Sequence, residues 1–169
     1  EKIKNYKKEI KILKKRLQSI EKDNNAASLL ADVSKYKKVK MSGHHSQGKN
    51  NVIKAENEKG EFVAIKIIRD DDHTINKELF INDACTRASF NHIALLPLLK
   101  YSIPTKDDDY YSIISPYMVN GDLHQLILKC SKKKQPANWE TIKAINIFGI
   151  AAGMAFLHSR GVIHRNLSS

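Results

Sequence analysis

Cysteine, acidic side chains and long apolar runs are all scarce in this sequence of 169 residues. The two cysteines, Cys85 and Cys130, lie far apart and show neither a disulfide framework nor the spacing of metal ligands. We therefore expect free thiols, no metal site and a cytoplasmic protein. No apolar run approaches the roughly 18 residues of a membrane-spanning helix, and no secretory signal stands at the N-terminus, so we expect no membrane span.

Basic charge is concentrated at one end of the chain. The formal net charge is +11, with 29 Lys and Arg against 18 Asp and Glu. Residues 1–40 hold thirteen of the basic and five of the acidic residues, a balance of +8, which leaves only +3 for the remainder. The basic character belongs to an N-terminal extension, so we expect no specific binding of nucleic acid by the body of the protein.

Residues 1–25 predict an amphipathic or coiled-coil helix. Its apolar side chains alternate spacings of three and four: Ile3, Tyr6, Ile10, Leu13, Leu17 and Ile20. This is a heptad seam of about three heptads. Two interpretations stay open, because residues 3–20 can bind a second copy or a partner helix, or can pack on their own domain. Asp23, Asn24 and Asn25 interrupt the pattern, so we expect the helix to end there and a linker to follow over residues 26–34.

The body of the chain predicts strands first and helices afterwards. We expect an α+β fold, with an antiparallel sheet of about five strands and one helix in the first half. Strands are expected at 36–41, 52–56, 62–68, 95–101 and 111–115, with a helix at 71–90 after the third strand. Gly60 lies in the turn between the second and third strands, where it can adopt positive φ. Further helices are expected at 123–129 and from the N-cap Asn138 to Gly161.

Three motifs stand in order along these elements: VAIK at 63–66, SPYMVNGDL at 115–123 and GIAAGMAFLHSRGVIHRNL at 149–167. Together with the element order they resemble a protein kinase of the tyrosine-kinase-like (Ser/Thr) group. The resemblance implies a kinase N-lobe at 35–115, then a hinge and a partial C-lobe at 116–169. It also implies ATP-dependent phosphoryl transfer to a protein hydroxyl.

The resemblance implies a nucleotide site that is weakened at its phosphate end. Gly43 and Gly48 stand where the family has the first and third glycines of its phosphate-covering loop. His45 replaces the middle glycine, and its Cβ obstructs the approach of the backbone to the phosphates. The other positions that the resemblance assigns to nucleotide binding are Val52, Ala64, Lys66, Asp83, Pro116, Met118 and Asp122.

Each of these positions has an implied role. Val52 and Ala64 resemble the ceiling of the adenine pocket, and alternation along the strand places Ala64 and Lys66 on one face. The Pro116 carbonyl and the Met118 amide and carbonyl resemble the adenine-binding hinge, which follows the small gatekeeper Ser115. Asp122 stands where the family often contacts ribose.

The partner of Lys66 is expected at Asp83, where the family has a helix glutamate. Aspartate is one methylene shorter, and Arg87 follows at the i,i+4 spacing of a helical ion pair. Glu78 lies five residues earlier, about 140° around the helix, so both acids cannot face the lysine. We expect a remodelled helix in place of a working Lys66–acid pair.

His164, Arg165 and Asn166 match the catalytic-loop motif except that the family has aspartate in place of Asn166. An amide cannot act as a general base. Phosphoryl transfer depends mainly on positioning and charge, so this loss alone does not abolish it. The sequence ends three residues later, before the Mg²⁺-binding asparagine and aspartate that the resemblance implies. We therefore expect weakened ATP binding, no Mg²⁺ ligands in these residues, and no catalysis by the chain as it stands.

Three hypotheses follow from this pattern. The chain is a piece of an impaired kinase, a pseudokinase that binds partners through its N-terminal helix, or a truncated product without a stable fold. Truncation also predicts that the long helix after Asn138 leaves apolar side chains partly exposed, among them Ile145, Phe148 and Phe156.

Overall fold

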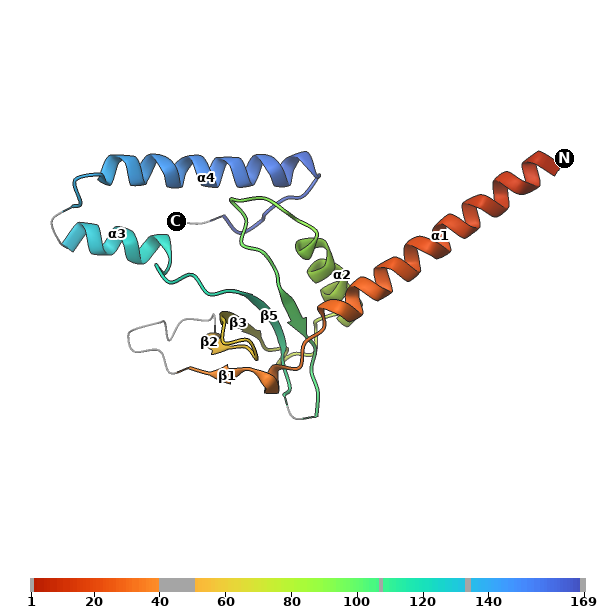
Figure 1. The fold of residues 1–169 in the computed structure, drawn as a ribbon, viewed down its shortest axis with the longest axis horizontal. Coiled ribbons are helices and arrows are strands. Elements are labelled where there is room, and N and C mark those ends of the chain that lie inside the picture. Colours follow the sequence, from red (N-terminus) through yellow and green to blue (C-terminus); the bar gives the residue numbers. More distant parts are fainter. Residues whose placement is uncertain (1, 40–50, 107, 133–134, 168–169) are drawn as a thin grey trace.

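The computed structural model describes residues 2–39, 51–106, 108–132 and 135–167. The elements in chain order are α1 (Lys2–Leu29), the 3₁₀ helix η1 (Val33–Lys35), β1 (Lys37–Lys38), β2 (Asn51–Glu56), β3 (Phe62–Ile68), α2 (Lys77–Ala88), β4 (Lys100–Ser102), β5 (Tyr111–Pro116), α3 (Leu123–Lys132) and α4 (Trp139–Ser159). Figure 1 shows the sheet with α2 as one part, α3 and α4 as a second part, and α1 projecting away from both.

The five strands form one antiparallel sheet in the order β1-β2-β3-β5-β4. β3 is central, and its Ala64 pairs with Lys54 of β2 and with Ser115 of β5. Gly60 has a φ of +79° in the β2–β3 turn, as the sequence predicted. The predicted α+β fold, with a sheet, one helix and then further helices, is confirmed.

Alternation along β3 separates the two faces of the sheet. Val63 and Ile65 are buried and pack with Val33, Ala55 and Ile114. The other face carries Ile113, which packs with Ala84 of α2 and Tyr101 of β4. Because paired residues in a sheet point to the same face, Lys66, which pairs with Ile113, lies on the face that α2 covers.

The start of α2 differs from the helix predicted over 71–90. Asp70 accepts hydrogen bonds at its Oδ1 from the backbone amides of Thr74 and Ile75, at 2.7 and 3.0 Å. These bonds hold the segment in a turn, with His73 at a φ of +51°. The helix begins only after Asn76, whose side chain accepts from the Leu79 amide and caps the N-terminus.

Two strand predictions are wrong in their extent. The first strand, expected at 36–41, is limited among the described residues to Lys37–Lys38. The fourth, expected at 95–101, is limited to Lys100–Ser102. The segment before β4 lies against α4, since Gly153 of that helix approaches Ala94 and Leu95. This packing takes the place of strand pairing.

The last turn of α1 is fixed to the edge strand β4. The helix continues to Leu29, beyond the end predicted at residues 23–25. The Tyr101 hydroxyl donates to the Ala26 carbonyl at 2.9 Å, and the Ala31 amide donates to the Tyr101 carbonyl at 2.8 Å. Burial raises the pKa of the Tyr101 phenol above its usual value, so the phenol stays protonated as a donor. Much of the segment predicted as a linker is therefore attached to the sheet.

One side of α4 is docked and the other is bare. The Phe156 ring stacks on His92 at 4.8 Å between centroids and meets Phe90 edge-on at 6.0 Å. Ile145 and Phe148 are 66% and 75% exposed, which confirms the exposure predicted for these two, whereas Phe156 is half-buried. Asn138 precedes the helix as predicted, but its side chain makes no capping hydrogen bond.

Among the described helices, α4 is long and apolar enough to cross a membrane by length and composition. Single polar residues such as Asn146 interrupt its apolar run without making the helix polar on average. Length and composition alone do not place a helix in a membrane, so the expected absence of a membrane span stays a prediction. A helix in a protein core has the same composition, but only 11% of its 18-residue apolar stretch is buried, at the side that holds Gly153 and Phe156.

The close approach at Gly153 predicts a position-specific effect on stability. A Cβ at Gly153 would lie 3.1 Å from the Ala94 carbonyl oxygen, whereas a Cβ at Gly149 would meet nothing within 4 Å. We expect Gly153→Val to lower the free energy of unfolding by about 1–3 kcal/mol through overpacking. Gly149→Val is the matched control and should not destabilise the fold. Equal melting temperatures for the two variants would show that α4 does not dock as described.

Candidate nucleotide site

The site is organised around Lys66 on the central strand β3. Its side chain is exposed, and its register partners are Val52 of β2 and Ile113 of β5. The neighbouring strand residues Val63 and Ile65 are locked into the core of the opposite face. Lys66 therefore lies on the face of the sheet that α2 covers.

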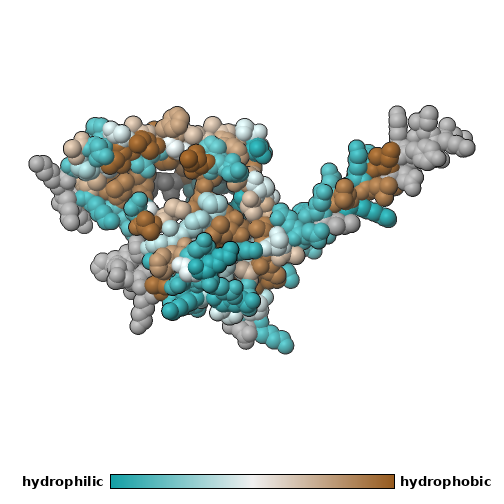
Figure 2. Space-filling view, in the orientation of Figure 1, coloured by the Kyte–Doolittle hydropathy of each residue, from teal (hydrophilic) through white to brown (hydrophobic). Residues whose placement is uncertain are grey.

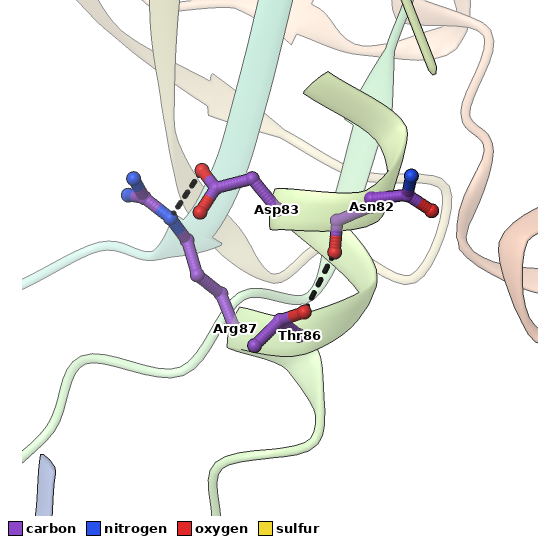
Figure 3. Close-up of polar contacts among 4 residues, drawn as sticks. All are labelled: Asn82, Asp83, Thr86 and Arg87. Carbon is purple, nitrogen blue, oxygen red and sulfur yellow. Dashed lines mark hydrogen bonds and ion pairs between the residues drawn. The ribbon is translucent and has the colours of Figure 1, made fainter. Parts of the chain in front are cut away.

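The acid expected to meet Lys66 is bound elsewhere. Asp83 Oδ2 lies 2.8 Å from Arg87 Nε, in the i,i+4 ion pair predicted from the sequence. Figure 3 shows these two side chains pointing toward one another along α2. Both side chains are 55% exposed, so the pair contributes only about 0.2–0.5 kcal/mol to the helix. Within the part of the chain that the structure describes, Lys66 makes no ion pair.

Figure 3 also shows the other polar contact of this helical turn. The Thr86 hydroxyl donates to the Asn82 carbonyl at 2.8 Å. Such i−4 bonding satisfies the hydroxyl within the helix. The polar side chains Asp83, Thr86 and Arg87 are thus occupied inside α2, and none of these bonds reaches the sheet.

Three partly exposed apolar residues, Val52, Ala64 and Met118, lie near Lys66, and we call them the apolar shelf. Val52 is 45% exposed and Ala64 is half-buried, and both are on the face that carries Lys66. Ser115, the predicted gatekeeper, is buried opposite Ala64. Met118 beyond β5 is 50% exposed. These side chains leave apolar surface exposed near Lys66, and ligand pockets are lined mostly by such surface.

The backbone of the predicted hinge is held to β3. Pro116 pairs with Val63, and the Tyr117 amide donates to the Phe62 carbonyl at 3.2 Å. The Met118 carbonyl accepts from the Gly121 amide at 3.1 Å, which uses one of its two lone pairs. A second acceptor position therefore remains on that carbonyl.

Lys54 lies beside the predicted hinge, where no motif in the sequence placed it. Its Nζ lies 3.9 Å from the centroid of Phe62 and 4.6 Å from that of Tyr117. A cation over two aromatic faces is stabilised by their quadrupoles, and this one stands next to the hinge. Alternation from Val52 already placed Lys54 on this face, but nothing in the sequence pointed to Tyr117 as its neighbour.

Asp122 caps a helix. Its Oδ1 accepts from the Gln125 amide at 2.7 Å, and its carbonyl accepts from the Leu126 amide, so it is the N-cap of α3. The predicted contact with ribose would have to share this carboxylate. One of its oxygens is already committed to the helix.

The catalytic-loop motif follows α4 in an exposed turn. Gly161, with a φ of +69°, ends the helix, and the Val162 amide donates to the Leu157 carbonyl at 2.9 Å. Residues 162–167 turn back beneath α4 in Figure 1. Arg165 has a left-handed φ of +64°. The backbone amide of Asn166 donates to His164 Nδ1 at 3.4 Å. All three motif residues are exposed.

The predicted phosphate-covering loop, with Gly43, His45 and Gly48, lies outside the described residues. Among the residues that are described, no group of three or more His, Cys, Asp or Glu side chains could hold a metal ion.

Comparison with known proteins identifies the family. The family described as protein tyrosine and serine/threonine kinase matches residues 41–169. The chain is 33% identical over 131 residues to the LRR receptor-like serine/threonine-protein kinase GSO1 of Arabidopsis thaliana, which covers 73% of this chain and 10% of that protein. It is 28% identical over 122 residues to the tyrosine-protein kinase receptor TYRO3 of Danio rerio, which covers 69% of this chain and 14% of that protein.

The chain belongs to the protein kinase family, as the motifs indicated. Its matched part spans only about a tenth of the length of the first relatives. The family uses ATP with Mg²⁺, and a kinase domain implies nucleotide binding. The sheet with α2 corresponds to the kinase N-lobe, and α3 and α4 correspond to the start of the C-lobe.

The capping bond of Asp122 predicts different effects for two substitutions. Asp122→Ala removes the acceptor for the Gln125 amide, so we expect a loss of about 0.5–2 kcal/mol in the free energy of unfolding. Asp122→Asn keeps an oxygen acceptor and should stay within about 0.5 kcal/mol of wild type. Chemical denaturation followed by circular dichroism measures both. A wild-type value for the alanine variant would show that the cap does not stabilise α3.

Proposed function

We propose that this protein binds ATP through its hinge and apolar shelf but transfers the γ-phosphoryl group poorly or not at all. It would then be an impaired kinase or pseudokinase whose role is to bind nucleotide and partner proteins. The observation that carries the proposal is the Asp83–Arg87 ion pair, at 2.8 Å, which occupies the acid that should hold Lys66.

The loss of this partner affects the placement of Lys66. A lysine side chain has four rotatable carbons and is strongly hydrated, so it is ordered only where an acid or a phosphate holds it. In this chain α2 supplies no such acid from Asp83. Bound phosphates would have to order the ammonium themselves, which removes part of the preorganisation on which phosphoryl transfer depends.

Asn166 supports the same conclusion from the other lobe. Its amide accepts no proton at neutral pH, so it cannot take the hydroxyl proton of a substrate. In the resemblance it replaces the catalytic aspartate, next to His164 and Arg165. Mg·ATP, when bound, supplies the reactive γ-phosphoryl group. The apolar shelf would cover the base and Lys66 would neutralise the phosphates, but no residue of the motif would activate the substrate hydroxyl.

The hinge and shelf support retention of nucleotide binding. Val52, Ala64 and Met118 leave apolar surface open beside the buried Ser115. The Pro116 carbonyl and the Met118 amide and carbonyl are the groups that would hydrogen-bond the adenine. The absence of an amide proton on Pro116 removes a donor that the base does not need.

A second role, partner binding through α1, is favoured by the exposure of its seam. Ile10, Leu13 and Leu17 are 51%, 55% and 56% exposed. This exposure supports partner binding over the alternative in which these seam residues pack on their own domain. We also propose a cytoplasmic location, because Cys85 and Cys130 are buried as free thiols.

Binding measurements on acidic variants of α2 test the proposal. In the complete natural polypeptide, we expect Lys66→Ala to weaken ATP binding by about threefold to tenfold, since it removes the only charge assigned to the phosphates. Asp83→Ala should leave the dissociation constant for ATP within about twofold of wild type, because Asp83 serves Arg87. Isothermal titration calorimetry measures both, and Glu78→Ala is the matched control on the same helix.

Two results would overturn this account of Lys66. An Asp83→Ala variant as impaired as Lys66→Ala would show that Asp83 holds the lysine when nucleotide binds. An impaired Glu78→Ala variant would show that Glu78 does so. Transfer of the γ-phosphate to a general protein substrate at about 1–100 s⁻¹, the usual range for kinases, would contradict the proposed impairment.

A further inference from the structure

The first helix presents an apolar seam that no described part of the chain covers. Figure 1 shows α1 projecting from the body, and Figure 2 shows brown apolar side chains along this projection. The described seam residues Ile10, Leu13 and Leu17 are each about half exposed. A helix of this length that leaves its seam in water is stabilised mainly by packing against another helix.

The body lies on the opposite side of α1 from the seam. Ala26 and Leu29 are half-buried where the helix joins the sheet, and the Ala26 carbonyl accepts from Tyr101. Asn24 and Ala27 continue the heptad spacing of the seam, and both are exposed. A helix turns by 100° per residue, so the midpoint of Asn24 and Ala27 lies about 160° around the helix axis from the midpoint of the anchored residues Ala26 and Leu29. A second helix can therefore lie along the seam without meeting the lobe.

The heptad pattern carries two features of a parallel pair. Asn24 falls at the a position of the last heptad, and a single asparagine at an a position specifies register and a two-stranded state. Ala27 follows at the d position, where a small side chain allows close approach beside the anchor. The remaining seam positions are apolar: Ile3, Tyr6, Ile10, Leu13, Leu17 and Ile20.

Charges beside the seam complement one another between two parallel copies. Arg16 and Glu21 occupy successive g and e positions, which face each other across a parallel, in-register pair. In the sequence, Glu9 and Lys14 stand in the same relation, whereas Lys2 and Lys7 form one unfavourable pair. Two attractive contacts per helix outnumber the repulsive one.

The sequence places no basic residue at the helical ion-pair spacing from these two glutamates. The residues three and four positions away from Glu9 and from Glu21 include no lysine or arginine. Ion pairs of the i,i+3 or i,i+4 kind are thus closed to both acids. No ion pair is found in α1 among the residues that the structure describes. The charges that would join two helices are therefore available.

We propose that α1 pairs with α1 of a second copy of this chain in a parallel, in-register two-stranded coiled coil. The two kinase lobes then lie at one end of the rod and on its outer sides, because each lobe is anchored opposite the seam. This inference rests on the partner-binding role proposed above for α1 and is independent of nucleotide binding. If α1 does not pair with a second copy, the results expected for the ATP titrations stay the same, so the two proposals can fail separately.

Sedimentation equilibrium of the complete polypeptide tests the pairing. We expect a dimer for the wild type and a monomer for Leu13→Asp/Leu17→Asp. Ile12→Asp is the matched control, because Ile12 is 46% exposed on the same helix but lies off the seam. This control should remain a dimer. A monomeric wild type, or equal behaviour of the seam variant and the control, would overturn the proposal.

Two further variants test the orientation. Glu21→Arg should raise the dimer dissociation constant by roughly threefold to tenfold, and Arg16→Glu/Glu21→Arg should restore it by exchanging the charges. Leu13→Cys should form an interchain disulfide on mild oxidation, since d positions face each other in a parallel pair; Cys85 and Cys130 are buried. A dimer that neither cross-links nor responds to the charge exchange would contradict the parallel arrangement.

Discussion

The pairing of β3 with β5 is the interaction on which the rest of the structure depends. Val63 and Ile65 on one face of this pair enter the core with Ile114, whereas Lys66 faces the helix side opposite Ile113. A shift of the register by one residue would send every one of these side chains to the wrong face. The same pairing delivers Pro116 beside Val63, so it also fixes where the hinge begins.

The elements outside the sheet are attached to this centre by few contacts. α1 is held through Tyr101 on the edge strand β4, and α4 is held where Phe156 meets His92. The exposed seam of α1 and the exposed side of α4 thus face away from the sheet. Exposed apolar surface of this kind is common at protein–protein interaction sites.

We propose that the candidate site keeps the apolar half of a kinase nucleotide site and has a rearranged charged half. Contact area and backbone groups near Ser115 and Met118 suit a purine base. On α2, the family's requirement for an acid at Lys66 competes with a local i,i+4 partner for Asp83, and the local partner is bound. A shorter acid and a nearby guanidinium are sufficient to explain this outcome, because the ion pair needs no rearrangement of the helix.

Local patterns in the sequence predicted the centre of the fold well. The third strand, its alternating faces, the turn at Gly60 and the Asp83–Arg87 pair all follow from short-range periodicity. The sequence failed where a side chain or a distant segment decided the structure. Asp70 holds a turn that delays α2, and the approach of Gly153 to Ala94 replaces the start of the fourth strand.

Contacts made across the fold were the least predictable part of the site. Lys54 meets Phe62 and Tyr117 only because β2, β3 and the hinge come together. Asp122 matched the position of a ribose contact, but the structure gives it a capping bond to Gln125 that the motif did not reveal. The predicted roles of Val52, Ala64, Met118 and Asn166 remain predictions, since no ligand contact tests them.

The affinities of the complete natural polypeptide for adenosine, ADP and Mg·ATP test the central claim most directly. If the hinge and shelf provide the binding while Lys66 lacks its helix partner, the phosphates add little. The three dissociation constants should then agree within about tenfold, or about 1.4 kcal/mol. Binding of Mg·ATP more than about a hundredfold tighter than adenosine would mean that the phosphate end is intact and would contradict the account.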